Sequence, residues 1–318
     1  MRKKISRKAI IQTAIPLVLL TIFALVVSFP KLVPLLQIKH PSYKGIGTVT
    51  FTYSIDEKKT SSFNMKQVPA GVAPGGCTDV PGATRVDEKF LIGETEVTEG
   101  LWLTVAKRAS QKGYVFYDKV RSNGKATLPA EYVSRRDAVV WCNALSEDLG
   151  LVPVYYSDES LSVKITSVLD LEKNGDKTFL NRAATGFRLP GTDEWELTAR
   201  YIDGEKWNSG CNPSGSEKNY NQETWSAGYA VFSLNSMSPV KTLSPNHLGV
   251  YDMSGNVWEW CYDQFGGDET TSEGKRVVRG GSWIGNAYRL QIGGEFGTLP
   301  GALENGQGFR LAKNGWDK

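Results

Sequence analysis

Tryptophan and glycine dominate the last third of this chain, where no long hydrophobic period is visible. Seven of the nine tryptophans lie after residue 190, and glycine supplies 33 of the 318 residues, above the usual share of about 7%. Short strands such as 276–279 alternate there with Gly-rich loops, and no internal repeat of about 20–50 residues is visible. Glycine permits tight backbone paths and tryptophan supplies burial that short strands cannot. The pattern predicts a compact domain of long, well-packed loops.

The charge of the body is close to neutral. The net charge of +3 includes five basic residues among the first eight, and the other 32 basic residues face 34 acidic ones. This balance argues against a nucleic-acid partner, because a protein that binds nucleic acid needs a basic face. The two histidines, His40 and His247, exclude a site with three His ligands, and no G-x-S-x-G elbow accompanies them.

The N-terminal segment is typical of an export or anchor signal. Residues 9–29 form an apolar stretch behind the basic cluster, long enough for a bilayer core of about 30 Å. A cleavable signal core is usually about 7–15 residues, and residues 26–28 form a weak cleavage motif; a buried core helix is the structural alternative. We favour an uncleaved anchor at 1–30, with the rest of the chain outside the cytoplasm, at the cell surface or in the periplasm.

Four cysteines, Cys77, Cys142, Cys211 and Cys261, are compatible with that compartment. The sequence has no C-x-x-C motif, which argues against zinc. Outside the cytoplasm they can form up to two disulfides, with three full pairings open. Cys142 lies in a predicted helix and is alternatively a free buried thiol.

The organisation of the chain follows from composition and period. Residues 31–61 resemble a stalk with leading strands, and residues 48–55 alternate as a half-buried strand does. The main domain is expected at 62–318. Residues 110–127 and 154–184 are polar and irregular, which predicts insertions.

Three segments have helix signals. Residues 90–109 predict a strand followed by a helix capped by Thr98. Ser134 and Asp137 resemble a capping box, and apolar residues recur behind them at helical spacing up to Gly150. A third helix is expected with Thr192 as its N-cap.

Six ordered motifs resemble the formylglycine-generating-enzyme-like branch of the C-type lectin fold. They are EVTEGLW at 96–102, SRRDAVVWCNALS at 134–146, GFRLPGTDEWELTAR at 186–200, NHLGVYDMSGNVWEW at 246–260, RVVRGGSW at 276–283 and GFRLA at 308–312. The resemblance covers about 62–314. It implies an α+β fold with long irregular loops, two to three helices and short antiparallel strands. Arg279 and Arg310 are expected to bridge strands to carboxylates or loop carbonyls.

The reactive centre of that family is missing from the sequence. Its enzymes convert a sulfatase cysteine to formylglycine with copper held by two cysteines, and the matching positions here are Gly285 and Leu290. Neither can ligate copper, and the related iron-dependent sulfoxide synthases need several His ligands. We therefore expect no enzyme activity and no required cofactor. A formylglycine-generating enzyme using other residues, or a remnant of one, is the alternative.

Calcium is the one metal that the resemblance suggests. Some family members bind it near the GN-x-W-E-W segment, where Asn256 and Glu259 could donate oxygens. Turn geometry for Asn256 and a strand salt bridge for Glu259 are the structural alternatives.

The loop at 284–303 carries apolar residues among glycines with no period. Together with its framing motifs it resembles the variable region of proteins diversified by retroelements, especially the treponemal variable proteins. In that family adenine-directed reverse transcription rewrites positions between fixed motifs, here within about 279–312. By this resemblance the diversified positions are Ile284, Gly285, Asn286, Arg289, Gly294, Phe296, Gly297, Thr298, Gly301, Ala302 and Leu303. Tyr288, Leu290, Gln291 and Ile292 are expected to belong to the frame.

These features together favour a non-catalytic, surface-displayed protein that binds protein or other macromolecular ligands through the loop. A buried irregular loop is the structural alternative for 284–303. A structural envelope protein with one fixed partner is the functional alternative.

Overall fold

A computed structural model describes residues 46–75, 82–117, 124–266 and 274–315 of the protein. The predicted anchor at 1–30 and most of the stalk lie outside these ranges. Within them, no helix combines the length and apolar character needed to cross a bilayer.

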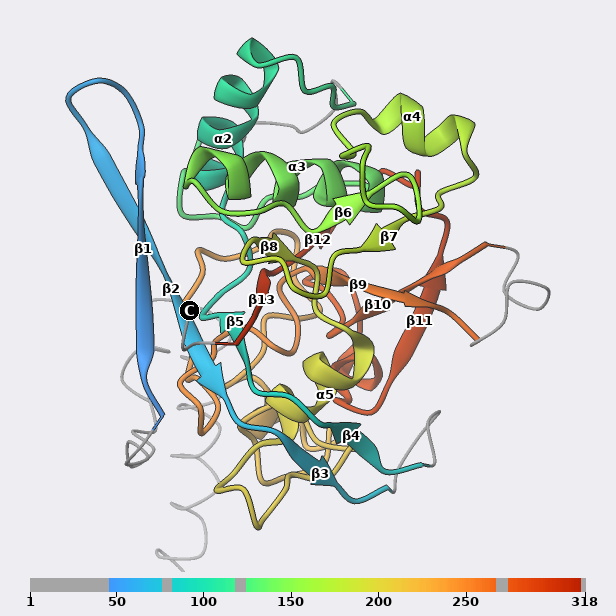
Figure 1. Ribbon diagram of the computed structural model, residues 1–318. Coiled ribbons are helices and arrows are strands. Elements are labelled where there is room, and N and C mark those ends of the chain that lie inside the picture. Colours follow the sequence, from blue (N-terminus) through green and yellow to red (C-terminus); the bar gives the residue numbers. More distant parts are fainter. Residues whose placement is uncertain (1–45, 76–81, 118–123, 267–273, 316–318) are drawn as a thin grey trace, which may run out of the picture. The chain divides into compact units, whose positions relative to one another are not determined.

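A five-stranded sheet joins the two ends of the domain (Figure 1). Its order is β1 (Thr48–Ser54), β2 (Thr60–Val68), β5 (Phe90–Gly93), β13 (Ala312–Asn314) and β8 (Phe187–Arg188), with every neighbouring pair antiparallel. β5 is buried along its whole length, as its central place requires. Phe51 of the leading strand packs on Phe187, with ring centroids 5.0 Å apart, so the sheet extends to the N-terminal side of residue 62.

A second sheet of four strands carries the Trp- and Gly-rich segments. Its order is β11 (Glu295–Thr298), β10 (Arg276–Arg279), β9 (Trp258–Gln264) and β12 (Gln307–Gly308). The strand expected at 276–279 is confirmed, and β12 pairs parallel to β9. Two small pairs complete the strands: β3 (Gly71–Ala73) with β4 (Thr84–Val86), and β6 (Tyr155–Tyr156) with β7 (Phe179–Leu180).

The helices are α2 (Glu99–Gln111), α3 (Arg135–Asp148), α4 (Val168–Lys173), α5 (Thr192–Arg200) and α6 (Glu223–Ser226), with a 3-10 turn, η2 (Ala287–Leu290). In Figure 1, α2 and α3 pack together beside β8, whereas α5 lies beside β3 and β4. Thr98 accepts from the Leu101 N–H, and Ser134 with Asp137 forms a capping box, so both predicted helix starts are confirmed.

The third helix start is corrected by one residue. Gly191 is the N-cap, and its N–H donates to the Glu194 carboxylate at 2.7 Å. Thr192 is the first helical residue, and its hydroxyl accepts from the Arg279 guanidinium instead. The interval at 154–184 was predicted to be irregular, but it contains the helix α4.

The core is built around stacked and edge-on aromatic rings. Trp102 and Trp141 stack at 5.7 Å, and Phe309 meets both edge-on. The free thiols of Cys142 and Cys261 are fully buried, which raises the pKa of each. Both thiols therefore stay protonated near neutral pH.

The other two cysteines are Cys77 and Cys211. Cys211 is disulfide-bonded. Cys77 lies outside the described residues.

Candidate functional site

Arg279 connects helix α5 to the base of the loop at 284–303. Its guanidinium donates to the Thr192 hydroxyl at 2.6 and 2.9 Å and to the carbonyls of Ile292 and Gly294 at 3.2 Å. An ion pair with Glu196, also at 3.2 Å, offsets its buried charge. The planar donor fork of arginine suits this arrangement, as the sequence predicted.

Arg310 and Glu259 form a second buried connection. Both side chains are 0% exposed, and two guanidinium nitrogens reach the two carboxylate oxygens at 2.5 Å. Glu259 also accepts from the Trp195 indole at 2.7 Å, while Arg310 donates to the Gly93 carbonyl at 3.0 Å. Glu259 is therefore the counter-ion of Arg310 within the frame.

Asn256 has the contacts of a tight turn. It lies at φ +60, its side-chain oxygen accepts from the Ser238 N–H, and its carbonyl accepts from the Trp283 N–H. Across the described ranges, no three His, Cys, Asp or Glu side chains gather to hold a metal ion. Calcium at Asn256 and Glu259 stays a prediction that these contacts do not support.

The loop backbone is held by neighbouring segments. The Leu290 carbonyl accepts from the Ser254 hydroxyl at 2.9 Å, and the Ile292 N–H donates to the Asn212 carbonyl at 3.1 Å. Because these bonds use backbone atoms of the loop, they do not depend on which side chains the loop presents.

None of the eleven predicted variable positions is buried. Ile284, Asn286, Arg289 and Phe296 are exposed, and Gly285, Gly294, Gly297, Thr298, Gly301, Ala302 and Leu303 are partly exposed. The predicted frame residues Leu290, Gln291 and Ile292 are buried. Tyr288, also expected in the frame, is 48% exposed. The structure thus brings the eleven positions to solvent on a fixed backbone.

Four exposed side chains, Ile284, Tyr288, Arg289 and Phe296, make what we call the aromatic face. The Arg289 guanidinium lies over the Phe296 ring at 4.7 Å and over the Tyr288 ring at 5.8 Å. Ile284 adds a side chain that is 50% exposed. Exposed apolar residues interleaved with one cation suit contact with another macromolecule.

The face continues onto residues that the sequence did not indicate. The Leu234 N–H donates to the Trp283 carbonyl at 2.8 Å, which places the 51%-exposed Leu234 side chain beside the loop. The Tyr220 ring meets the Tyr288 ring edge-on at 5.6 Å. Neither residue carries a sequence signal of its own, because scattered exposed apolar residues are normal.

The glycines among the predicted positions are not equivalent. A Cβ atom at Gly297 would lie 2.3 Å from the Phe265 ring, whereas at Gly285 its nearest neighbour would be the Ser282 carbonyl at 3.4 Å. At Gly301 the nearest atom would be Nη1 of the Arg136 guanidinium, at 3.0 Å. Gly297 therefore accepts a side chain only if Phe265 moves.

The positions that match the copper ligands of the family provide no thiolate. Gly285 is partly exposed, and Leu290 is buried against Ala287 and Ala230. Their side chains supply no soft donor for Cu(I).

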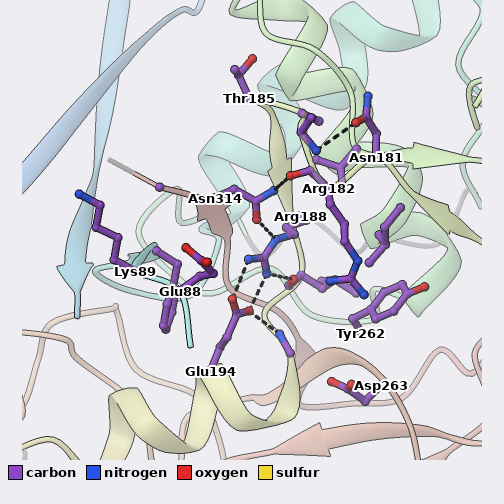
Figure 2. A pocket seen from close by; sticks show the side chains of 18 residues that line it. Glu88, Lys89, Asn181, Arg182, Thr185, Arg188, Glu194, Tyr262, Asp263 and Asn314 are labelled. Carbon is purple, nitrogen blue, oxygen red and sulfur yellow. Dashed lines mark hydrogen bonds and ion pairs between the residues drawn. The ribbon is translucent and has the colours of Figure 1, made fainter. Parts of the chain in front are cut away.

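A cleft of about 680 Å³ lies beside the start of α5, away from the predicted loop residues. Figure 2 shows Arg188 at its centre, where the guanidinium binds the Glu194 carboxylate at 2.6 and 2.7 Å and Asn314 at 2.8 Å. The Asp263 carboxylate accepts from the Thr192 N–H at 2.5 Å. These polar groups hold strand and helix ends together, which gives the cleft wall a structural role.

Known proteins are similar to this chain over 40% to 84% of its length. The structure of Treponema denticola variable protein 1 matches 84% of this chain and 99% of its own, with a TM-score of 0.63 and 29% identity. Chaperone protein LppX of Paenibacillus barcinonensis is 30% identical over 248 residues, 71% of this chain and 80% of that protein. The inactive C-alpha-formylglycine-generating enzyme 2 of Bos taurus is 33% identical over 135 residues, 40% of this chain and 44% of that protein.

The family and the fold follow from these matches. The α+β architecture and the treponemal match confirm the expected C-type lectin fold of the formylglycine-generating type. The sulfatase-modifying factor enzyme 1-like domain matches residues 52–315, and the chain belongs to that family.

Proposed function

We propose that this protein is a non-catalytic binding protein, displayed outside the cytoplasm, whose loop at 284–303 is diversified to bind different macromolecular ligands. The observation that carries the proposal is the difference in burial between the predicted variable residues and the frame residues of the loop. All eleven predicted variable residues are at least partly exposed, while the buried Leu290, Gln291 and Ile292 hold the backbone. Such a loop can change its contacts at small cost to the fold.

The non-catalytic part of the proposal has two supports. Similarity to a variable protein and to an inactive formylglycine-generating enzyme fits a ligand-binding role without catalysis. The two positions that match the copper ligands, Gly285 and Leu290, lack the required donor chemistry.

Display outside the cytoplasm is supported by two further features. Residues 9–29 are apolar and follow a basic cluster, as an anchor with a cytoplasmic N-terminus requires. Cys211 is disulfide-bonded, and disulfides persist mainly in oxidising compartments.

Binding at the aromatic face would use rigid apolar contacts. Phe296 and Tyr288 bring large rings with few rotatable bonds, so little side-chain entropy is lost when they are covered. Arg289, held over both rings, adds donors for polar groups of the ligand.

The DNA beside the gene tests diversification. We expect a near-copy of the region encoding about residues 279–318, differing almost only at adenines of the copy, next to a reverse transcriptase gene. The mismatched codons should fall at exposed positions such as Ile284, Arg289 and Phe296.

Failure to find such a copy, together with an unchanged loop in related chains, would contradict diversification. A binding protein with one fixed partner would then be the better proposal. The similarity to a protein named as a chaperone favours this second candidate.

A further inference from the structure

A second groove lies at the C-terminal end of the loop. Its volume is about 620 Å³. It is lined by the start of α3, the turn after α4, the start of β10 and the loop at 299–302. Two predicted variable positions, Gly301 and Ala302, lie on its wall, so the groove is continuous with the proposed binding loop.

The two carboxylates of the groove are already paired. Arg136 binds Asp176 through two nitrogens at 2.7 and 2.9 Å and Glu172 at 3.1 Å. The same guanidinium donates to the Tyr117 hydroxyl at 2.7 Å. Because one arginine engages both acids, they are not bound to the other cations of the groove.

Arg276 is the cation without such a partner. It starts β10 opposite Thr298, at the edge of the groove. Its Nε is buried and has no hydrogen-bond partner, and no ion pair of Arg276 is found in the described ranges. A buried donor without a partner costs free energy. Among the described residues, the Arg276 guanidinium therefore has no carboxylate counter-ion beside the groove.

A second arginine, Arg135, lies behind the groove wall, with its guanidinium over the Tyr262 ring at 5.4 Å. Arg135 is 0% exposed, and its Nε and Nη1 have no hydrogen-bond partner. Only its Nη2 donates, to the Tyr262 carbonyl at 3.2 Å. Burial, together with the nearby charge of Arg276, lowers the pKa of Arg135 to about 10. The two cations repel each other across the wall.

The exposed Lys177 adds a third positive charge to the groove rim. Arg276 and Lys177 thus face an opening whose own acids are used by Arg136. Positive charge in a walled groove attracts anions more strongly than on a flat surface.

We propose that this groove binds the carboxylate side chains of an acidic segment in a protein ligand. The proposal rests on the proposed binding function and adds the chemistry of the partner. The Arg276 guanidinium matches a carboxylate in shape and charge. The small Gly301 and Ala302 leave the entrance open, and the 54%-exposed Leu299 offers an apolar contact beside it.

The test uses the full chain in detergent and a fluorescein-labelled peptide of alternating Glu and Leu, followed by fluorescence anisotropy. Arg276→Gln should weaken binding roughly ten-fold, the effect of losing one charge-assisted pair. Gly301→Asp should weaken it by a similar factor, because it places a carboxylate beside Arg136 at the entrance. Arg182→Gln, an exposed arginine of the other cleft, should leave binding unchanged.

Equal binding by the wild type, R276Q and G301D would overturn the proposal. So would equally tight, equally R276Q-sensitive binding of a dT oligonucleotide of the same charge, since that indicates attraction of any polyanion. A thermal melt of each variant separates lost binding from lost folding. The test on the DNA beside the gene is independent of peptide binding. If the near-copy of the coding region is found but the peptide does not bind, only the groove proposal is wrong.

Discussion

The frame around Arg279 and Arg310 is buried, whereas the neighbouring loop at 284–303 carries exposed side chains. Arg279 and Arg310 are 1% and 0% exposed and bind carboxylates and carbonyls of distant segments. Ile284, five residues after Arg279, and Phe296, on the strand paired with β10, are 50% and 44% exposed. The frame fixes the backbone path, so the side chains of the loop are free to serve contact with a ligand.

The largest effect is expected from breaking the buried pair of the frame. Glu259→Gln leaves the Arg310 charge without its counter-ion in a fully buried place. Such a change typically costs about 3–5 kcal/mol. Denaturant unfolding of the purified variant measures the loss in free energy of unfolding.

The double variant E259Q/R310M is the matched control. Replacing the charge as well should recover part of the loss, because the unpaired cation is removed. A Glu259→Gln cost below about 1 kcal/mol would be typical of a solvent-exposed pair, and the distinction between frame and loop would lose its main support.

A second effect is expected from the acid next to that pair. Burial raises the pKa of Asp252 to about 6, above the usual value near 3.9. The folded state therefore binds the proton more tightly than the unfolded state does. The stability that Asp252 contributes is present below about pH 4 and is lost as pH rises through 6.

Asp252→Asn removes this titration and can keep the hydrogen bond from the Lys241 N–H, now 2.9 Å long. The free energy of unfolding of the variant, relative to the wild type, should rise by about 2–3 kcal/mol between pH 4 and 7. Asparagine also tolerates the φ of +56 at this position. A difference that stays flat across this range would show that the Asp252 pKa is ordinary.

The sequence predicted the frame well because its signals are local or fixed by geometry. The capping box at Ser134, the Thr98 cap and the bridging role of Arg279 all appear in the structure. The N-cap of α5 was misplaced by one residue, since the Thr192 hydroxyl is engaged by an arginine 87 positions away. A hydrogen bond between distant segments leaves no local signal.

The candidate site was predictable only in part for the same reason. The apolar loop was visible in the sequence, but Leu234 and Tyr220 join its surface through contacts with Trp283 and Tyr288. The groove depends on Arg276. The sequence does not show that Arg276 Nε has no partner, because only the fold brings Asp176 to Arg136.

A smaller effect is expected where frame and loop meet. Gly297→Ala should cost about 1–3 kcal/mol by overpacking, because its Cβ would lie 2.3 Å from the Phe265 ring. Gly285→Ala, with its nearest contact at 3.4 Å, should stay within about 0.5 kcal/mol. Unfolding by urea compares the two.

The collision itself is tested in a Phe265→Ala background. There Gly297→Ala should cost much less, since the ring that blocks the new methyl group is gone. An equal cost in both backgrounds would point to backbone strain instead. A glycine that must stay glycine belongs to the frame, and Gly297 would then not be one of the positions proposed to be diversified.

The smallest effect on stability is expected in the aromatic face. Truncating Ile284, Arg289 and Phe296 together to alanine removes side chains outside the core, with Ile284 50% and Phe296 44% exposed, so each should cost about 1 kcal/mol or less. The same triple change should abolish binding of a ligand selected against the wild-type face, because a few aromatic and arginine anchors dominate such interfaces. Thermal melts and a binding titration of one preparation give both numbers. Three separate losses of several kcal/mol would instead assign these side chains to the core, and the loop could then not be rewritten without unfolding the domain.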